Sequence, residues 1–134
     1  MEKRTIQLKG IDPVTFTSID ANSLDSGIKK LELVIDENLM DFADIQLMIN
    51  DSGEINVWAG MVDELSSFEE LSRAIAVLII ITAGQDFKAE KLNLTLETIQ
   101  NKLPVDSLLL YTLINDESIK SEIILFSTTH PKNE

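Results

Sequence analysis

The sequence predicts one domain of the α+β or α/β class, with helices alternating with about four strands. A continuous β-branched run at Ala76–Thr82 is typical of a central strand, and an apolar spacing of three or four residues after Leu24 is typical of a helix. Two further apolar segments, Ser107–Ile114 and Ser121–Thr128, flank a short polar turn. The length of 134 residues suits a single domain.

The composition excludes several classes of function. Eleven Lys and Arg against 23 Asp and Glu give a net charge of −12, which repels phosphate backbones, so we expect no nucleic-acid partner. The absence of cysteine and the single histidine exclude disulfides, thiolate nucleophiles and the usual zinc sites, so no metal is expected. Met1–Gly10 has no apolar leader, and the longest apolar run, Ala74–Ile81, is far shorter than the roughly 20 residues that span a bilayer. We therefore expect a cytoplasmic protein without membrane insertion.

The first third of the chain contains a weak strand candidate and a helix. Thr5–Leu8 is the strand candidate. A helix is predicted over Leu24–Ile35, although its Leu31–Ile35 part would also suit a short strand. The apolar positions that define this helical face are Leu24, Ile28, Leu31, Ile35 and Leu39.

The next segment, Phe42–Asn50, fits two structures. Ile45, Leu47 and Ile49 alternate as in a strand, whereas Phe42, Ile45, Met48 and Ile49 share one face of a helix. A break at Asp51–Gly53 follows, and the alternating residues of Ile55–Gly60 predict a strand.

The second half carries clearer signals. Ser67 to Glu70 has the spacing of a capping box, which predicts a short helix after it. Ala76–Thr82 is the predicted central strand, and Thr95–Leu103 is a predicted helix that ends before a proline. Ser107–Ile114 and Ser121–Thr128 are predicted to pair as a hairpin.

Three segments, in this order, resemble the C-terminal domain of the bacterial division GTPase FtsZ, of the tubulin/FtsZ superfamily. Leu39–Asn50 (LMDFADIQLMIN) is similar to the family's NxDFADV loop and the helix after it. Ala76–Phe87 (AVLIIITAGQDF) is similar to its GVLVNITGGxDL strand and turn, and Ser107–Thr129 to its closing pair of strands around an IDE-containing turn. The resemblance covers Gly27–Thr129.

The resemblance implies an α+β domain built on a four-stranded mixed sheet with helices packed on it. The strands would lie at about 54–61, 76–83, 107–114 and 121–128, and Phe42–Asn50 would be a helix. Leu24–Ile35 would correspond to the end of the family's long core helix.

The implied organisation has three parts. Residues 1–22 form an N-terminal segment of unclear role, residues 23–129 form the FtsZ-like domain, and residues 130–134 are a polar tail. The family's GTPase domain has no counterpart, because the five glycines are scattered and form no phosphate-binding loop. The segment Met61–Ile75 is shorter than in the family, and Leu39 stands where the family has asparagine.

The resemblance also implies a site. Each subunit of an FtsZ filament presses an acidic loop onto the nucleotide held by its neighbour, where carboxylates orient the attacking water. The matching carboxylates here are Asp41 and Asp44, and Leu39, Met40 and Phe42 would lie at the interface. No cofactor of its own is expected, since GTP would be bound only by a partner subunit.

The same two acids also have a purely structural interpretation. Asp41 is at the position of a helix N-cap, and Asp44 follows three residues later, as in a capping box. Both carboxylates would also favour the positive end of the helix dipole. Capping and catalysis in trans are compatible, because the cap fixes the loop geometry that catalysis would use.

Three functions follow from these expectations. The first expectation is a cell-division or cytoskeletal interaction domain, which docks on FtsZ-type subunits through its acidic loop and caps or regulates filaments. Alternatively, the chain is the C-terminal half of a split FtsZ-type GTPase that supplies Asp residues in trans, or a homo-oligomeric module unrelated to division. Whether it is an enzyme stays open, since it could contribute to GTP hydrolysis only in trans.

Overall fold

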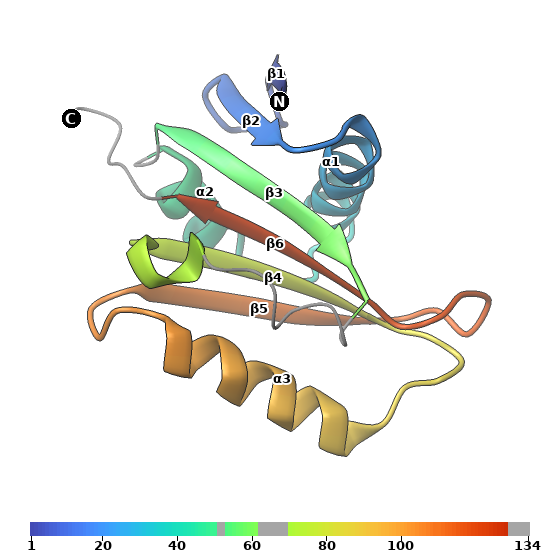
Figure 1. Cartoon of the computed structure of the whole chain (residues 1–134). Coiled ribbons are helices and arrows are strands. Elements are labelled where there is room, and N and C mark those ends of the chain that lie inside the picture. The colour runs from blue at the N-terminus through green and yellow to red at the C-terminus, as the bar shows by residue number, and fades with distance from the viewer. Residues whose placement is uncertain (51–52, 62–69, 129–134) are drawn as a thin grey trace.

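The computed structural model describes residues 1–50, 53–61 and 70–128. These residues form a mixed six-stranded sheet in the order β1-β2-β3-β6-β4-β5, with helices on both faces (Figure 1). The strands are β1 (Glu2–Ile6), β2 (Val14–Ser18), β3 (Glu54–Gly60), β4 (Ala76–Ala83), β5 (Leu108–Asn115) and β6 (Glu122–Thr128). The helices are α1 (Ala21–Asp36), α2 (Phe42–Asn50), the 3₁₀ turn η2 (Glu70–Arg73) and α3 (Ala89–Lys102).

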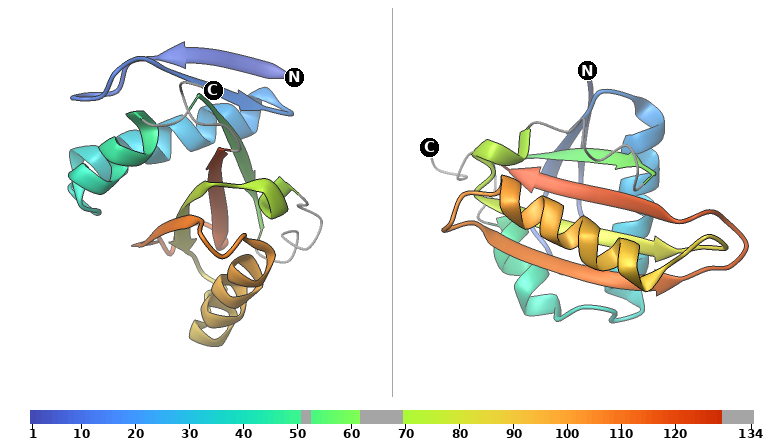
Figure 2. Two further views of the ribbon diagram at one scale, coloured as in Figure 1. Left: turned by 90° about the vertical axis from the view of Figure 1, so that its left-hand side faces the viewer. Right: turned by 60° about the horizontal axis from the view of Figure 1, so that its bottom comes forward.

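The sheet separates two apolar layers (Figure 2). Every residue of β4 is buried, because side chains of alternating residues enter opposite layers. Leu78 and Ile80 belong to the layer with α1 and α2, whereas Val77, Ile79 and Ile81 belong to the layer with α3 and η2. This double coverage explains why β4 is an uninterrupted apolar run rather than an alternating one.

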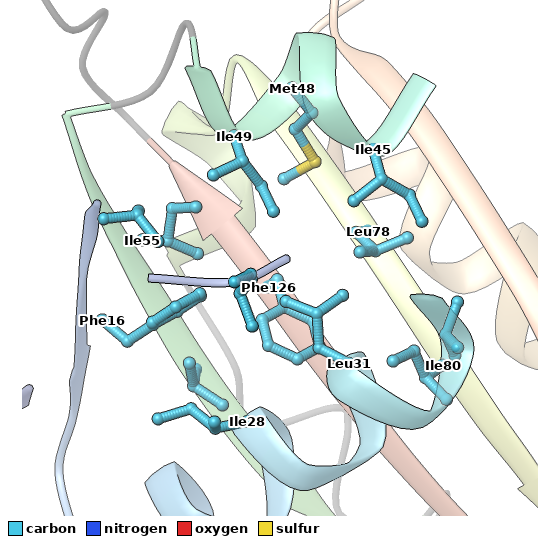
Figure 3. Packing of buried hydrophobic residues seen from close by; sticks show 14 of the residues in the cluster. Phe16, Ile28, Leu31, Ile45, Met48, Ile49, Ile55, Leu78, Ile80 and Phe126 are labelled. Atoms are coloured by element: carbon cyan, nitrogen blue, oxygen red, sulfur yellow. The ribbon is translucent and has the colours of Figure 1, made fainter. Parts of the chain in front are cut away.

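The larger layer lies between the sheet, α1 and α2 (Figure 3). Phe16 of β2 and Phe126 of β6 meet edge to face, with ring centroids 6.1 Å apart and an interplanar angle of 73°. Leu31 of α1 and Ile45 of α2, which are both fully buried, belong to the same apolar cluster as this aromatic pair. Burial of such side chains supplies the main free energy that holds the helices on the sheet.

The first 22 residues extend the sheet, so the prediction of four strands is wrong. β1 and β2 pair antiparallel, and β2 then runs parallel to β3 with Phe16 beside Ile55. The weak strand signal at Thr5–Leu8 corresponds to β1, which lies earlier, at Glu2–Ile6. β2 joins the sheet because Phe16 and Ser18 are buried there, and the Ser18 hydroxyl donates to the Val57 carbonyl at 2.8 Å.

The predicted hairpin of the last two strands is also wrong. β5 and β6 do not pair with each other, since β4 lies between them. β4 runs parallel to β5, with Ala76 beside Leu108, and antiparallel to β6, with Ala76 beside Thr128. A fully buried strand needs hydrogen-bond partners on both edges, and the two apolar segments supply one edge each.

The helix predictions hold, with shifted boundaries. Phe42–Asn50 is helical, and the helix predicted at Leu24–Ile35 is α1, which begins at Ala21 behind an N-cap from Asp20. α3 begins at Ala89 rather than at Thr95, whose hydroxyl donates to the Lys91 carbonyl at 2.7 Å within the helix.

The capping box predicted at Ser67–Glu70 lies outside the described residues, apart from the start of η2. Among the described residues, no helix combines the length and apolar character needed to cross a bilayer.

A tight junction joins the end of β4 to the turn before β6. The Gly84 N–H donates to the Ser121 hydroxyl at 3.0 Å, and the Gln85 N–H donates to the Ile119 carbonyl at 2.8 Å. In return, the Ser121 N–H donates to the Asp86 carboxylate at 2.6 Å. A Cβ atom at Gly84 would lie 2.2 Å from the Ile119 carbonyl oxygen, so only glycine permits this approach.

Candidate protein-interaction site

The acidic loop that the sequence singled out joins α1 to α2, and we define it as residues 36–44. α1 ends in a Schellman motif, in which the Asn38 N–H donates to the Ile35 carbonyl at 3.2 Å and the Leu39 N–H to the Val34 carbonyl at 3.0 Å. Asn38 takes the left-handed conformation that this motif needs, with φ of 58°. Asparagine tolerates that conformation better than most residues do, so the turn is set by the local sequence.

Asp41 caps α2, as its spacing predicts. Its Oδ1 atom accepts the Ala43 N–H at 3.0 Å, and its carbonyl accepts the N–H groups of Asp44 and Ile45 at 3.1 and 3.3 Å. Asp44 lies in the first turn of α2 with an exposed side chain. Both carboxylates therefore lie at the positive end of the helix dipole, where negative charge is stabilised.

Two neighbouring segments hold the acidic loop in place. The Gln46 side-chain amide donates to the Gly10 carbonyl at 2.9 Å, and the Phe42 ring lies against Gly10, where an added Cβ would be 2.9 Å from Cζ. On the other side, the Thr112 hydroxyl of β5 donates to the Leu39 carbonyl at 3.2 Å. A loop fixed from both sides presents its charges in a defined geometry.

The surface of the loop is strongly acidic. Asp36, Glu37, Asp41 and Asp44 are all exposed. Of the three predicted interface residues, Leu39 has 39% of its surface exposed, whereas Met40 and Phe42 are partly buried against the core. A surface hollow beside the loop is lined by Lys9, Gly10, Ile35, Asp36, Asn38 and Phe42.

The side chains of the acidic loop can take part in few kinds of interaction. Its carboxylates accept hydrogen bonds from water or from cationic groups, but they repel phosphate. Within the part of the chain that the structure describes, no three His, Cys, Asp or Glu side chains converge as a metal site would need. The acidic loop therefore suits contact with a partner that brings the complementary groups.

Neither the scan against family models nor the search of curated proteins finds a match. Solved structures do match. An FtsZ dimer from M. jannaschii is similar over 66% of this chain and 30% of its own, with a TM-score of 0.55 and 20% identity. The chain shares its fold with FtsZ. A W319Y mutant of FtsZ from M. jannaschii is similar over 69% of this chain and 32% of its own, with a TM-score of 0.55 and 20% identity.

CetZ from Methanosaeta thermophila also matches, over 73% of this chain and 35% of its own, with a TM-score of 0.51 and 8% identity. This chain thus spans about a third of the length of the FtsZ and CetZ structures, which is consistent with the C-terminal domain alone. At these identities the similarity shows the fold. It confirms the resemblance to FtsZ predicted from three sequence segments.

The acids of the loop are evident from local sequence, whereas its supports are not. The Gln46 and Thr112 contacts join segments far apart in the chain, at Gly10 and Leu39. No local spacing in the sequence pairs Gln46 with Gly10 or Thr112 with Leu39. The packing of α2, of β5 and of the connection between β1 and β2 brings these groups together.

Proposed function

We propose that this domain is a cell-division or cytoskeletal interaction module that docks on FtsZ-type subunits through the acidic loop. The observation that carries the proposal is the position of Asp41 and Asp44, exposed at the N-terminus of a helix in a fold shared with FtsZ. The supports of the loop from Gly10 and β5 fix that position before any partner binds, which reduces the entropy lost on docking.

The chemistry of docking follows from the charges. A carboxylate near a partner-bound GTP would accept a hydrogen bond from the attacking water and orient it, without touching the phosphate itself. One oxygen of Asp41 is held by the Ala43 N–H, which orients the carboxylate. Leu39 would supply the apolar contact beside it, since its side chain is exposed.

The domain would regulate FtsZ filaments by capping their ends. In these 134 residues the glycines are too scattered to form a phosphate-binding loop. A subunit made of these residues would therefore cover a neighbour's nucleotide face and offer no such face to the next subunit. Growth would stop at that end, so small amounts would have a large effect on polymer length.

The test adds the 134-residue chain to FtsZ from M. jannaschii with GTP and follows light scattering, sedimented polymer and GTP turnover. We expect polymer and turnover to fall at amounts well below one chain per FtsZ. The double variant Asp41→Asn with Asp44→Asn should lose the effect, because asparagine still caps a helix but carries no charge. Glu97→Gln, an exposed change on α3, is the matched control and should act like the wild type. Unchanged polymer and turnover at excess chain would overturn the proposal.

The same assay separates the two alternatives. If the chain raises turnover when mixed with an isolated FtsZ GTPase domain, and Asp41→Asn abolishes the rise, it supplies carboxylates in trans. If it ignores FtsZ and sediments as an oligomer by itself, it is a homo-oligomeric module.

A further inference from the structure

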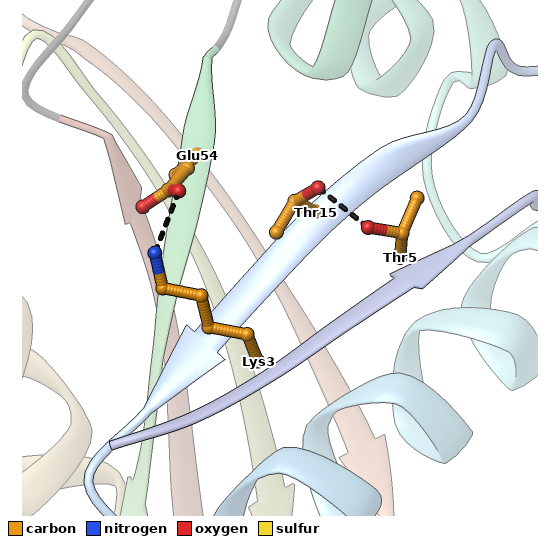
Figure 4. Close-up of polar contacts among 4 residues, drawn as sticks. All are labelled: Lys3, Thr5, Thr15 and Glu54. Atoms are coloured by element: carbon orange, nitrogen blue, oxygen red, sulfur yellow. Dashed lines mark hydrogen bonds and ion pairs between the residues drawn. The ribbon is translucent and has the colours of Figure 1, made fainter.

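The two edge strands of the sheet, β1 and β5, differ in charge. β1 is short and carries Glu2, Lys3 and Arg4. Lys3 reaches across β2 to Glu54, with 3.1 Å between Nζ and Oε1, and Thr5 and Thr15 share a hydrogen bond of 2.7 Å (Figure 4). Charged side chains on a short edge strand are a usual protection against pairing with another chain.

β5, the opposite edge, lacks this protection. It has no charged residue, no proline and no glycine, and it pairs with β4 from Leu108 to Asn115 without a bulge. Leu108, Tyr111 and Leu113 have 39%, 53% and 38% of their surfaces exposed. Figure 2 shows β5 as the outermost strand on its side of the sheet.

Along this edge of β5, backbone N–H and C=O groups have no strand partner among the residues that the structure describes. The N–H of Leu108 donates to the Ile75 carbonyl at 3.0 Å, and that of Asp116 donates to the Ala83 carbonyl at 2.9 Å. The backbone N–H and C=O groups of the even-numbered residues of β5 therefore point toward β4. Alternation along a strand then turns the N–H and C=O groups of the odd-numbered residues outward. These residues are Leu109, Tyr111, Leu113 and Asn115, and no strand of the described residues pairs with them.

The charges around β5 select the kind of strand that would fit. Asp106 precedes the strand, and Asp116 and Glu117 follow it. Hydrogen bonds from the hydroxyl and N–H of Ser118, together with the nearby Lys30 ammonium, lower the pKa of Asp116 below its usual 3.8. Acidic groups therefore stand at both ends of an uncharged edge, and the acidic loop touches the middle of the strand through Thr112 and Leu39.

A second copy of this chain fits this edge poorly. Antiparallel pairing with Tyr111 opposite its counterpart would bring Asp106 of one chain to Asp116 of the other at both ends. Two chains of net charge −12 would also repel each other before contact. A strand with basic ends meets neither obstacle.

We propose that the free edge of β5 is a docking site for an extended segment of another protein, with an uncharged β-forming middle flanked by lysine or arginine. The segment would add a seventh strand next to β5 through the outward backbone groups and cover Tyr111 and Leu113. This site does not depend on docking to FtsZ, because it uses the outward backbone groups of odd-numbered β5 residues, whereas the acidic loop contacts β5 through the Thr112 side chain.

The test uses a synthetic peptide of alternating valine and threonine with two lysines at each end, and the same peptide with glutamates instead. Binding to the full 134-residue chain is measured by fluorescence anisotropy, and backbone protection by amide hydrogen exchange. We expect the lysine peptide to bind at least about tenfold more tightly than the glutamate peptide, with an affinity that falls as salt rises. Exchange should slow at Leu109, Tyr111, Leu113 and Asn115.

Leu113→Lys should weaken binding of the lysine peptide by about tenfold or more, because it places a positive charge on the edge that repels the lysines. Leu94→Lys, at a site on α3 with 64% exposure, is the matched control and should bind like the wild type. No slowed exchange on β5 with either peptide would overturn the proposal. Slowed exchange on β5 in the chain alone, rising with its concentration, would overturn it in favour of a second copy.

Discussion

The Ala43 backbone N–H donates a hydrogen bond to the Asp41 carboxylate, with 3.0 Å between nitrogen and Oδ1. This bond satisfies one of the free N–H groups at the start of α2. Asp41→Ala removes it and should lower the free energy of unfolding by about 1 kcal/mol. Asp41→Asn keeps a capping oxygen and should lower the free energy of unfolding much less. Urea unfolding of the three proteins tests this, and equal losses in both variants would show that Asp41 does not act as a cap.

Gly27 of α1 lies directly over Val57 of β3. A Cβ atom at position 27 would be 2.4 Å from Val57 Cγ1 and 3.5 Å from the Phe126 ring. Gly27→Ala should therefore destabilise the fold, since overpacking costs about 1–3 kcal/mol, more than the roughly 1 kcal/mol gained in helix propensity.

A double-mutant cycle isolates this contact. In a Val57→Ala background the space for the new methyl group is open, so Gly27→Ala should be neutral or stabilising. The free energy of unfolding of the four proteins gives the coupling between the two positions. Additive effects would mean that α1 and β3 are not this close.

The fold was predictable where the chain's local pattern and its packing agree. The run at β4 and the periodic face of α1 gave correct elements, because each is buried along its length. The order of β4, β5 and β6 was not predictable, since two apolar segments around a short turn satisfy the pattern of a hairpin equally well. Only the need of β4 for partners on both edges separates β5 from β6.

The site was predictable in part for the same reason. The cap at Asp41 is a local feature, because the residue that caps α2 lies directly before the helix in the sequence. The contacts from Gln46 to Gly10 and from Thr112 to Leu39 are long-range, and no local spacing encodes them. β2 was missed because its five residues alternate too briefly to stand out from the polar segment around them.

The junction between Asp86 and Ser121 makes part of the stability depend on pH. Hydrogen bonds from the N–H and hydroxyl of Ser121, with a smaller contribution from Lys91, lower the pKa of Asp86 below its usual 3.8. A carboxyl whose pKa is lower in the folded state stabilises the fold above its unfolded pKa. That contribution is lost as the pH falls through the folded pKa, which lies below 3.8.

Asp86→Asn removes this dependence while keeping an acceptor for the Ser121 N–H. The wild type should be the more stable protein at pH 7, and the difference should shrink at acidic pH below about 3.8. Urea unfolding across this range measures it. A difference that stays constant down to strongly acidic pH would contradict the charged hydrogen bond.

Docking through the acidic loop is tested most directly by the amide resonances of the isotope-labelled chain on addition of M. jannaschii FtsZ with GTP. We expect shifts and broadening to concentrate in residues 36–44, and to disappear in the Asp41→Asn, Asp44→Asn variant. Changes limited to Leu109, Tyr111, Leu113 and Asn115 would assign the contact to the free edge of β5 instead. Spectra that do not change would contradict docking on FtsZ altogether.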